Sequence, residues 1–335
     1  YHFHSLWVPQ SGMRDCGGIG PCPVGYGGRF DMRRVGGWLS GLPVLLGLVL
    51  SCGKGGSDGG AAGTVQVVTS ITVLEDFVRA VGGDQVEVRS LITGLENPHT
   101  YEPRARDVQA VARAELFVKI GLGLEAWAEK VMENAGSSRL RVLEVSQGIE
   151  VLERGAEGEH GGNPHIWMDP RNAKGMIGAI RDALEELRPK KAAYFRSRYA
   201  AYVSQLDDLM REMGERFCGL RGRRVVTYAP AFPYLLRWLQ IVEAERIMTV
   251  PGMEPSARRV TEVVDRMKAE GIRVILTMPQ YSGKVPEMVA SETGAQVVRI
   301  TPLLGGLPGT ETYLGMIRYD AERIAEGLEG VGSRE

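Results

Sequence analysis

The order of hydrophobic and polar positions predicts two sets of alternating strands and helices. Short β-branched or apolar runs between turn residues are typical of buried strands, and apolar residues at helical spacing are typical of amphipathic helices. In the first set we expect strands over residues 64–69, 85–92, 115–120 and 139–145, and helices over residues 72–81, 104–114 and 125–135. Strands that alternate with helices form βα units, so this set predicts a mainly parallel sheet.

A second set of the same kind follows two long helical patterns. The first pattern covers residues 171–188 and ends at Pro189, and the next covers residues 190–217. Beyond them we expect strands over residues 223–228, 245–249, 272–277 and 296–300, and helices over residues 233–239, 255–270, 284–293 and 311–328. The predicted fold class is therefore α/β, with two lobes that each hold a mainly parallel four-stranded sheet flanked by helices. One long linking helix, placed at residues 171–188, joins an N-terminal lobe at residues 64–170 to a C-terminal lobe at residues 189–330.

The first 63 residues lack this alternation, and the segment from Met32 to Cys52 resembles a bacterial lipoprotein signal. Arg33 and Arg34 precede an apolar run, and a small residue stands directly before Cys52. The apolar run is short for a transmembrane anchor, which needs about 20 residues. We therefore expect Met32 to be the true start and Cys52 to carry a lipid. We therefore interpret residues 1–31 as a disordered segment upstream of the true start, residues 32–51 as a signal peptide and residues 52–63 as a flexible tether.

Two segments share the sequence Asn-Pro-His, at residues 97–99 and 163–165. Proline fixes its own φ and restricts the residue before it, so each histidine lies on a stiff turn and not within a helix. An Asn-Pro pair marks a turn in any case, and a single copy would be an ordinary turn. Two copies favour a metal site that pairs His99 with His165, because neutral imidazole is the commonest metal ligand. Ligands of open α/β sheets bind outside the carboxyl ends of the strands, which places this site in the cleft between the lobes.

Charge and motifs exclude several other classes of function. The chain has 40 basic and 41 acidic residues, so electrostatics give no reason to expect a nucleic-acid partner. It has neither a nucleophile elbow nor an HExxH motif. A metallohydrolase built on the two histidines would also need a carboxylate ligand and a general base, and neither is evident. We therefore predict a binding protein and not an enzyme.

Six segments, in order along the chain, resemble the metal-binding solute-binding lipoproteins of zinc and manganese ABC importers, the TroA-like or ZnuA-like family. They are residues 97–103, 121–127, 163–170, 254–256, 279–282 and 312–319. The resemblance runs from about residue 64 to residue 328. It implies a monomer, lipid-anchored outside the cytoplasm in the periplasm or at the cell surface. Such a protein captures a divalent ion, zinc in preference to manganese, and delivers it to an ABC permease and its ATPase. A surface adhesin is the alternative, because tethered lipoproteins also bind host or matrix partners.

The chain departs from this family at two ligand positions. Members usually hold the metal with four residues, and the first two correspond to His99 and His165. The third falls at Ala229, which has no donor atom, and the fourth, usually acidic, falls at Thr301. Fewer carboxylates imply weaker binding, and we expect protons to compete with metal around the unperturbed imidazole pKa of about 6.5.

Zinc normally takes four protein ligands, or three and a water, so three interpretations stay open. In the first, a glycine-rich loop supplies His160 together with Glu159 or Glu157. In the second, a small chelator accompanies the metal and fills the vacated positions. In the third, metal binding is lost and the cleft takes another ligand. We favour them in that order, because both Asn-Pro-His turns persist.

Further residues are predicted to support the metal ligands or to line the cleft. Asp169 would cap the following helix or accept a hydrogen bond from a metal-bound histidine. Glu254 would cap a helix or act as a late ligand, and Glu102 would orient its turn. Tyr228 is expected in the cleft wall or the core, and the Thr301 hydroxyl is expected in the cleft.

Overall fold

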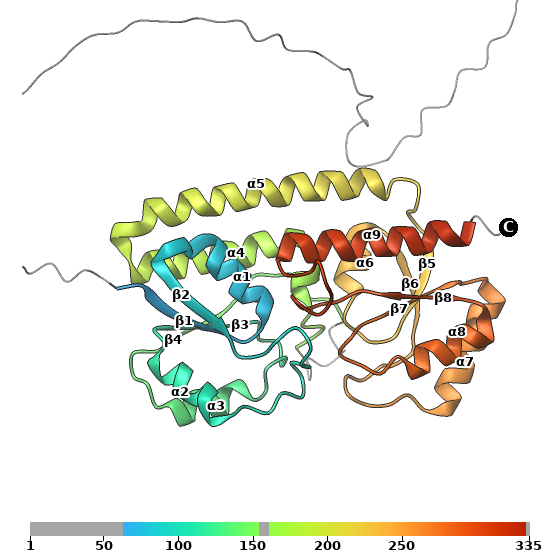
Figure 1. The fold of residues 1–335 in the computed structure, drawn as a ribbon, viewed down its shortest axis with the longest axis horizontal. Coiled ribbons are helices and arrows are strands. Elements are labelled where there is room, and N and C mark those ends of the chain that lie inside the picture. Colours follow the sequence, from blue (N-terminus) through green and yellow to red (C-terminus); the bar gives the residue numbers. More distant parts are fainter. Residues whose placement is uncertain (1–62, 154–160, 333–335) are drawn as a thin grey trace, which may run out of the picture. The chain divides into compact units, whose positions relative to one another are not determined.

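The structure is a computed structural model, and it describes residues 63–153 and 161–332 of the 335-residue chain. From Gly63 onwards these residues belong to one compact unit that contains two parallel sheets (Figure 1). The expected upstream segment, signal peptide and lipidated Cys52 lie outside the described residues. Within the described ranges no helix is both long and apolar enough to cross a membrane.

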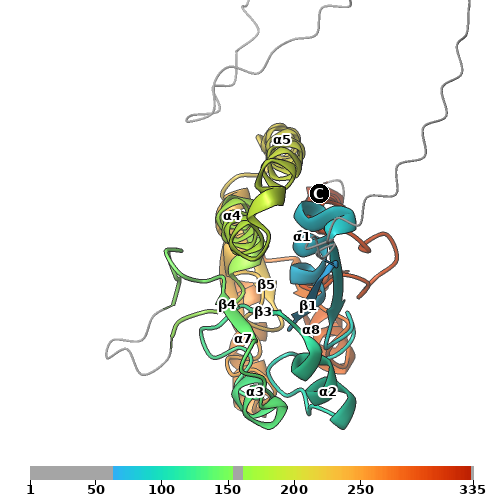
Figure 2. The same cartoon turned by 90° about the vertical axis from the view of Figure 1, so that its left-hand side faces the viewer.

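The first sheet has the strand order β2-β1-β3-β4, and every neighbouring pair is parallel. Its elements are β1 (Val65–Thr69), α1 (Thr72–Gly82), a 3-10 turn (Gly83–Gln85), β2 (Val86–Ser90), α2 (Ala105–Arg113), β3 (Leu116–Lys119), α3 (Ala128–Ala135) and β4 (Arg141–Glu144). Figure 2 shows α1 and α4 over one face of this sheet and α2 and α3 over the other. The central strands β1 and β3 consist mainly of apolar and β-branched residues, as expected for strands that are covered by helices on both faces.

The second sheet repeats this arrangement with the order β6-β5-β7-β8, again entirely parallel. Its elements are β5 (Arg224–Thr227), α6 (Pro233–Leu239), β6 (Val242–Arg246), α7 (Ala257–Glu270), β7 (Val274–Thr277), α8 (Lys284–Thr293), β8 (Gln296–Arg299) and α9 (Tyr313–Gly332). The predicted fold class, two lobes with parallel four-stranded sheets, is thus confirmed. The strand predicted at residues 245–249 begins three residues earlier, as β6. This edge strand has the sequence Val-Glu-Ala-Glu-Arg, which lacks the apolar run used to predict strands.

The predicted long linking helix is present, but it is the second of the two long helices. A short 3-10 turn (Ile166–Met168) leads into α4 (Pro170–Leu187), which packs against α1 and β4 of the first lobe. After Arg188 and a 3-10 turn (Pro189–Lys191), α5 (Ala192–Arg216) contacts both α1 of the first lobe and α9 of the second (Figure 1). The range 171–188 therefore belongs to the first lobe, and α5 is the helix that spans the two.

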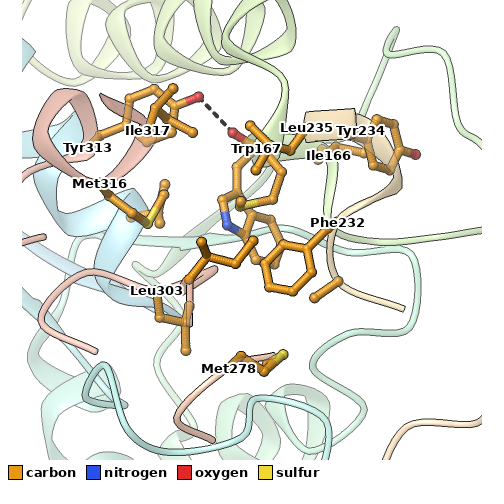
Figure 3. Close-up of a cluster of buried hydrophobic side chains, with 14 of the residues drawn as sticks. Ile166, Trp167, Phe232, Tyr234, Leu235, Met278, Leu303, Tyr313, Met316 and Ile317 are labelled. Atoms are coloured by element: carbon orange, nitrogen blue, oxygen red, sulfur yellow. Dashed lines mark hydrogen bonds between the residues drawn. The ribbon is translucent and has the colours of Figure 1, made fainter. Parts of the chain in front are cut away.

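One hydrophobic core cluster continues from the first lobe into the second. Trp167, which is fully buried, lies where the two halves meet. Its indole N–H donates to the Pro302 carbonyl at 2.7 Å, and its own carbonyl accepts from the Tyr313 hydroxyl at 2.6 Å. Figure 3 shows the second of these bonds, with Leu303 and Phe232 near the indole. The position of His165, two residues before Trp167, is thereby fixed relative to both lobes.

Candidate metal-binding site

A small cavity lies where loops of both lobes meet, at the carboxyl ends of both sheets. The loops after β2 and β4 form its first-lobe wall, and loops after each of β5, β6, β7 and β8 form its second-lobe wall. The described lining residues are Asn97, Pro98, His99, His165, Trp167, Pro230, Ala231, Pro251, Met278, Tyr281, Pro302 and Leu303. Its volume of about 10 Å³ is room for a single ion or water molecule. This is the place where open α/β sheets bind ligands, and it contains both predicted histidines.

The two Asn-Pro-His segments form the same turn. In each, the asparagine Oδ1 accepts a hydrogen bond from the backbone N–H of the histidine at 3.0 Å. The rings of His99 and His165 then lie with their centroids 5.3 Å apart and their planes at 48°. A tetrahedral ion bound to one nitrogen of each ring would hold the centroids about 5 Å apart, since Zn–N bonds are about 2.0–2.1 Å. The spacing therefore suits one metal ion between two imidazoles.

The Asn163 side chain also selects the tautomer of His165. Its Nδ2 donates to the Pro230 carbonyl at 2.8 Å and to Glu153 at 2.9 Å, and both of these partners can only accept. The amide oxygen therefore faces His165, and it receives the Nδ1–H of the ring at 2.9 Å. With the proton on Nδ1, the lone pair of His165 is on Nε2. This is the usual way in which a protein orients a metal-binding histidine.

His99 carries a buried nitrogen that lacks a partner. Among the described residues nothing hydrogen-bonds to its Nε2, although that atom is shielded from solvent. Burial lowers the pKa of His99 to about 4. Burial, the charge of His99 and that of Arg246 hold the pKa of His165 well below its usual value. Both rings are neutral near pH 7, and a buried polar atom without a partner costs free energy that a bound ion would relieve.

A wider groove leads from this cavity to solvent and shares both histidines with it. Its volume is about 520 Å³, within the range of small-molecule sites. Arg246 lies in its wall, where its guanidinium pairs with Glu153 at 2.7 Å and with Glu243 at 2.6 Å. A chelator that accompanied the metal would fit in the groove but not in the inner cavity.

The remaining predicted residues lie at varying distances from this cavity. Asp169 caps α4, as expected, with its Oδ1 accepting from the backbone N–H of Arg171 at 2.9 Å. Tyr228 is buried against Tyr281, with ring centroids 5.7 Å apart. Glu102 and Glu254 are exposed and do not belong to the described cavity wall.

The two positions at which the family ligands are replaced are both buried. Ala229 and Thr301 stand next to cavity residues, but neither is part of the described lining. The Thr301 hydroxyl is used within its own loop, where it donates to the Leu303 carbonyl at 3.0 Å. His160 and Glu159 fall outside the described residues. The ranges that the structure does describe contain no group of three or more His, Cys, Asp or Glu side chains able to hold a metal.

Sequence reasoning missed several contributors to the site. The role of Asn163 was readable in principle, because the asparagine of an Asn-Pro-His turn can bond both the backbone and the ring of the histidine. Tyr281 lay within a segment that resembles the family. No local signal marks Met278, Pro251 or Ala231, since the walls come from loops far apart in the sequence.

Replacing Asn163 with alanine should weaken metal binding about 10–100-fold, the usual cost of losing a partner that orients a metal ligand. The control is Asn97→Ala, which removes the same turn bond from His99 and a bond to the Tyr281 hydroxyl, but no bond to the histidine ring. Isothermal titration calorimetry with zinc compares the two variants. Equal losses would show that the turn, and not the bond to the ring, carries the effect.

The chain matches known proteins over most of its length. The profile of the family described as zinc-uptake complex component A, periplasmic (ZnuA), matches residues 67–327. The iron-binding protein YfeA of Yersinia pestis is 30% identical over 270 residues, which is 78% of this chain and 86% of YfeA. A crystal structure of ZnuA superimposes with a TM-score of 0.72 at 29% identity, covering 79% of this chain and 99% of that one.

Some relatives are much longer than the matched region. The zinc-binding protein AdcA of Streptococcus pyogenes serotype M3 is 25% identical over 288 residues, which is 79% of this chain but 56% of AdcA. The chain thus spans about half the length of this curated relative. What AdcA does as a whole protein depends also on a part with no counterpart in the match.

Proposed function

Because this chain belongs to the ZnuA family of periplasmic zinc-uptake components, we propose that it is the extracytoplasmic solute-binding component of an ABC importer for a divalent metal ion. The cargo is zinc in preference to manganese, bound between the lobes and handed to a membrane permease with its ATPase. The relatives support a metal cargo, since AdcA is named a zinc-binding protein and YfeA an iron-binding protein. They give no comparable support to an enzyme.

One observation carries this proposal: two neutral imidazoles face a one-ion cavity, and a buried nitrogen of His99 has no partner among the described residues. A core histidine without a ligand role would be expected to pair both ring nitrogens, because an unpaired buried polar atom costs about 1–3 kcal/mol.

The direct test is the metal content of purified residues 53–335. Mass spectrometry should find zinc bound at about one ion per chain, and titration against a competing chelator should give the affinities for zinc, manganese and iron. A protein that neither carries nor takes up any of these ions would contradict the proposal.

We propose two ways in which the metal could obtain ligands beyond His99 and His165. In the first version His160 completes the coordination shell together with Glu159 or Glu157, and all three follow Glu153, which lines the groove. In the second version a small chelator lies in the groove and supplies donors in place of those lost at Ala229 and Thr301. The second version predicts that zinc binds more tightly in the presence of the chelator, and equilibrium dialysis with and without cell extract tests it.

We also propose that the mature protein is a monomer held at the membrane by a lipid on Cys52. The motif Arg33-Arg34, an apolar run and a small residue before the cysteine support this anchor. Cys52→Ala should abolish labelling with a radioactive fatty acid and release the protein from the membrane fraction. Unchanged fractionation together with unchanged labelling would contradict the anchor and leave metal binding untouched.

A further inference from the structure

The hydrogen-bonding groups in the wall of the one-ion cavity are largely used by the protein itself. The Tyr281 hydroxyl accepts from Asn97 Nδ2 at 3.1 Å. The Pro302 carbonyl accepts from the indole of Trp167, and the Pro230 carbonyl accepts from Asn163. These oxygen atoms are therefore committed to holding the lobes and loops together.

Three side chains of the described wall offer a nitrogen or sulfur lone pair: the imidazoles of His99 and His165 and the thioether of Met278. The buried Nε2 of His99 has no partner among the described residues, and the bond from His165 Nδ1–H to Asn163 leaves the lone pair of that ring on Nε2. Met278 directly follows β7, is 7% exposed, and lies at the edge of the cluster drawn in Figure 3. A thioether is a weak hydrogen-bond acceptor but a soft metal ligand.

The charge of this donor set is as informative as its chemistry. Two imidazoles and a thioether are all neutral, and the described lining of the cavity includes no carboxylate. The cost of moving an ion from water into an apolar cavity rises with the square of its charge, so a dication loses more than a monovalent ion here. Soft sulfur ligands select Cu(I), and imidazole suits copper as well as zinc.

We propose that Met278 is a third metal-facing donor, and that His99, His165 and Met278 together let this site take a soft monovalent cation, Cu(I), in addition to its divalent cargo. The inference rests on the proposed function in so far as both use the histidine pair. Only the Cu(I) proposal depends on the Met278 sulfur, because imidazole and water can bind zinc without it.

The test compares Cu(I) and zinc binding in the parent protein and two leucine variants. Cu(I) is titrated without oxygen, under reducing conditions, against a colorimetric Cu(I) chelator, and zinc is titrated in parallel. Met278→Leu should lower Cu(I) affinity at least about tenfold, the smallest loss expected when support for a metal ligand is removed, and should lower zinc affinity by a smaller factor. The matched control Met267→Leu, on α7 and buried but outside the described cavity wall, should change neither affinity.

X-ray absorption of the Cu(I)-loaded parent gives a readout that needs no variant. We expect a sulfur scatterer beside nitrogen, and we expect it to disappear in Met278→Leu, a substitution of similar volume that cores tolerate well. Absence of sulfur from the parent spectrum, or equal Cu(I) affinity in Met278→Leu, would overturn the role of Met278. If zinc binding still depended on both histidines, the proposed function would stand. A parent protein that bound neither metal would overturn both.

Discussion

Alanine in place of either histidine should abolish zinc binding. His99 and His165 supply both nitrogen donors of the described site, and a single imidazole cannot hold a zinc ion that normally has four ligands. Because the rings lie 5.3 Å apart at one cavity, loss of either leaves the other as a lone donor. We expect no zinc binding by calorimetry and a loss of affinity of more than about 100-fold by competition with a chelator.

Two further variants make this result specific. Glu254→Gln removes a carboxylate that is exposed and outside the described cavity wall, so it should bind zinc as the parent does. His160→Ala should weaken binding clearly if the glycine-rich loop completes the shell, and should have no effect if a chelator does. Zinc binding at parental strength in both His99→Ala and His165→Ala would show that the metal is held elsewhere.

The metal-free protein should lose stability as the pH falls from about 6.5 to about 4. The pKa of His99 is about 4 in the folded protein, against 6.5 for an exposed histidine. Between these values the unfolded chain binds a proton that the folded protein does not, so acid favours unfolding. A difference of about 2.5 pKa units corresponds to about 3 kcal/mol, and the loss is complete only below pH 4. His165, whose pKa is also lowered, acts in the same direction.

Urea unfolding of the metal-free parent and of His99→Gln at pH 7 and pH 4.5 measures this contribution. The variant keeps a polar side chain but cannot titrate, so it should lose less stability over this interval. The comparison with the variant is needed because buried Asp76 and Asp320, whose pKa values are raised by burial, bind protons in the folded state and act in the opposite direction. Equal losses in both proteins would show that His99 titrates normally.

The same shift changes the pH at which metal should be released. From the sequence, competition by protons was expected around pH 6.5. With both histidine pKa values lowered by burial, zinc affinity should instead vary little down to about pH 5.

Most of the fold could be predicted because each central strand is a short apolar run flanked by turn residues. The helices over residues 233–239 and 284–293 agree with the structure to the residue. The exceptions have local causes. The helix expected from residue 125 begins at Ala128, because Gly121, Leu122 and Gly123 all have positive φ and prolong the turn after β3.

The candidate site could be predicted only in its first-lobe half. The prolines of the two Asn-Pro-His turns constrain the backbone locally, so the sequence alone shows that His99 and His165 are held in similar frames. The opposite wall depends on how four loops of the second lobe converge, which no local pattern encodes. A methionine or a proline in such a loop has no feature that distinguishes it from a core residue.

The hydrogen bonds of Trp167 have a consequence for any attempt to dissect the protein. A fragment ending at residue 170 would keep the indole but lose Pro302 and Tyr313, its partners in the second lobe. It would also lose α4 and α5 and expose the apolar surface that the continuous core now covers. Expressed by itself, such a half should be recovered mainly in inclusion bodies. Studies of either lobe therefore require the whole chain.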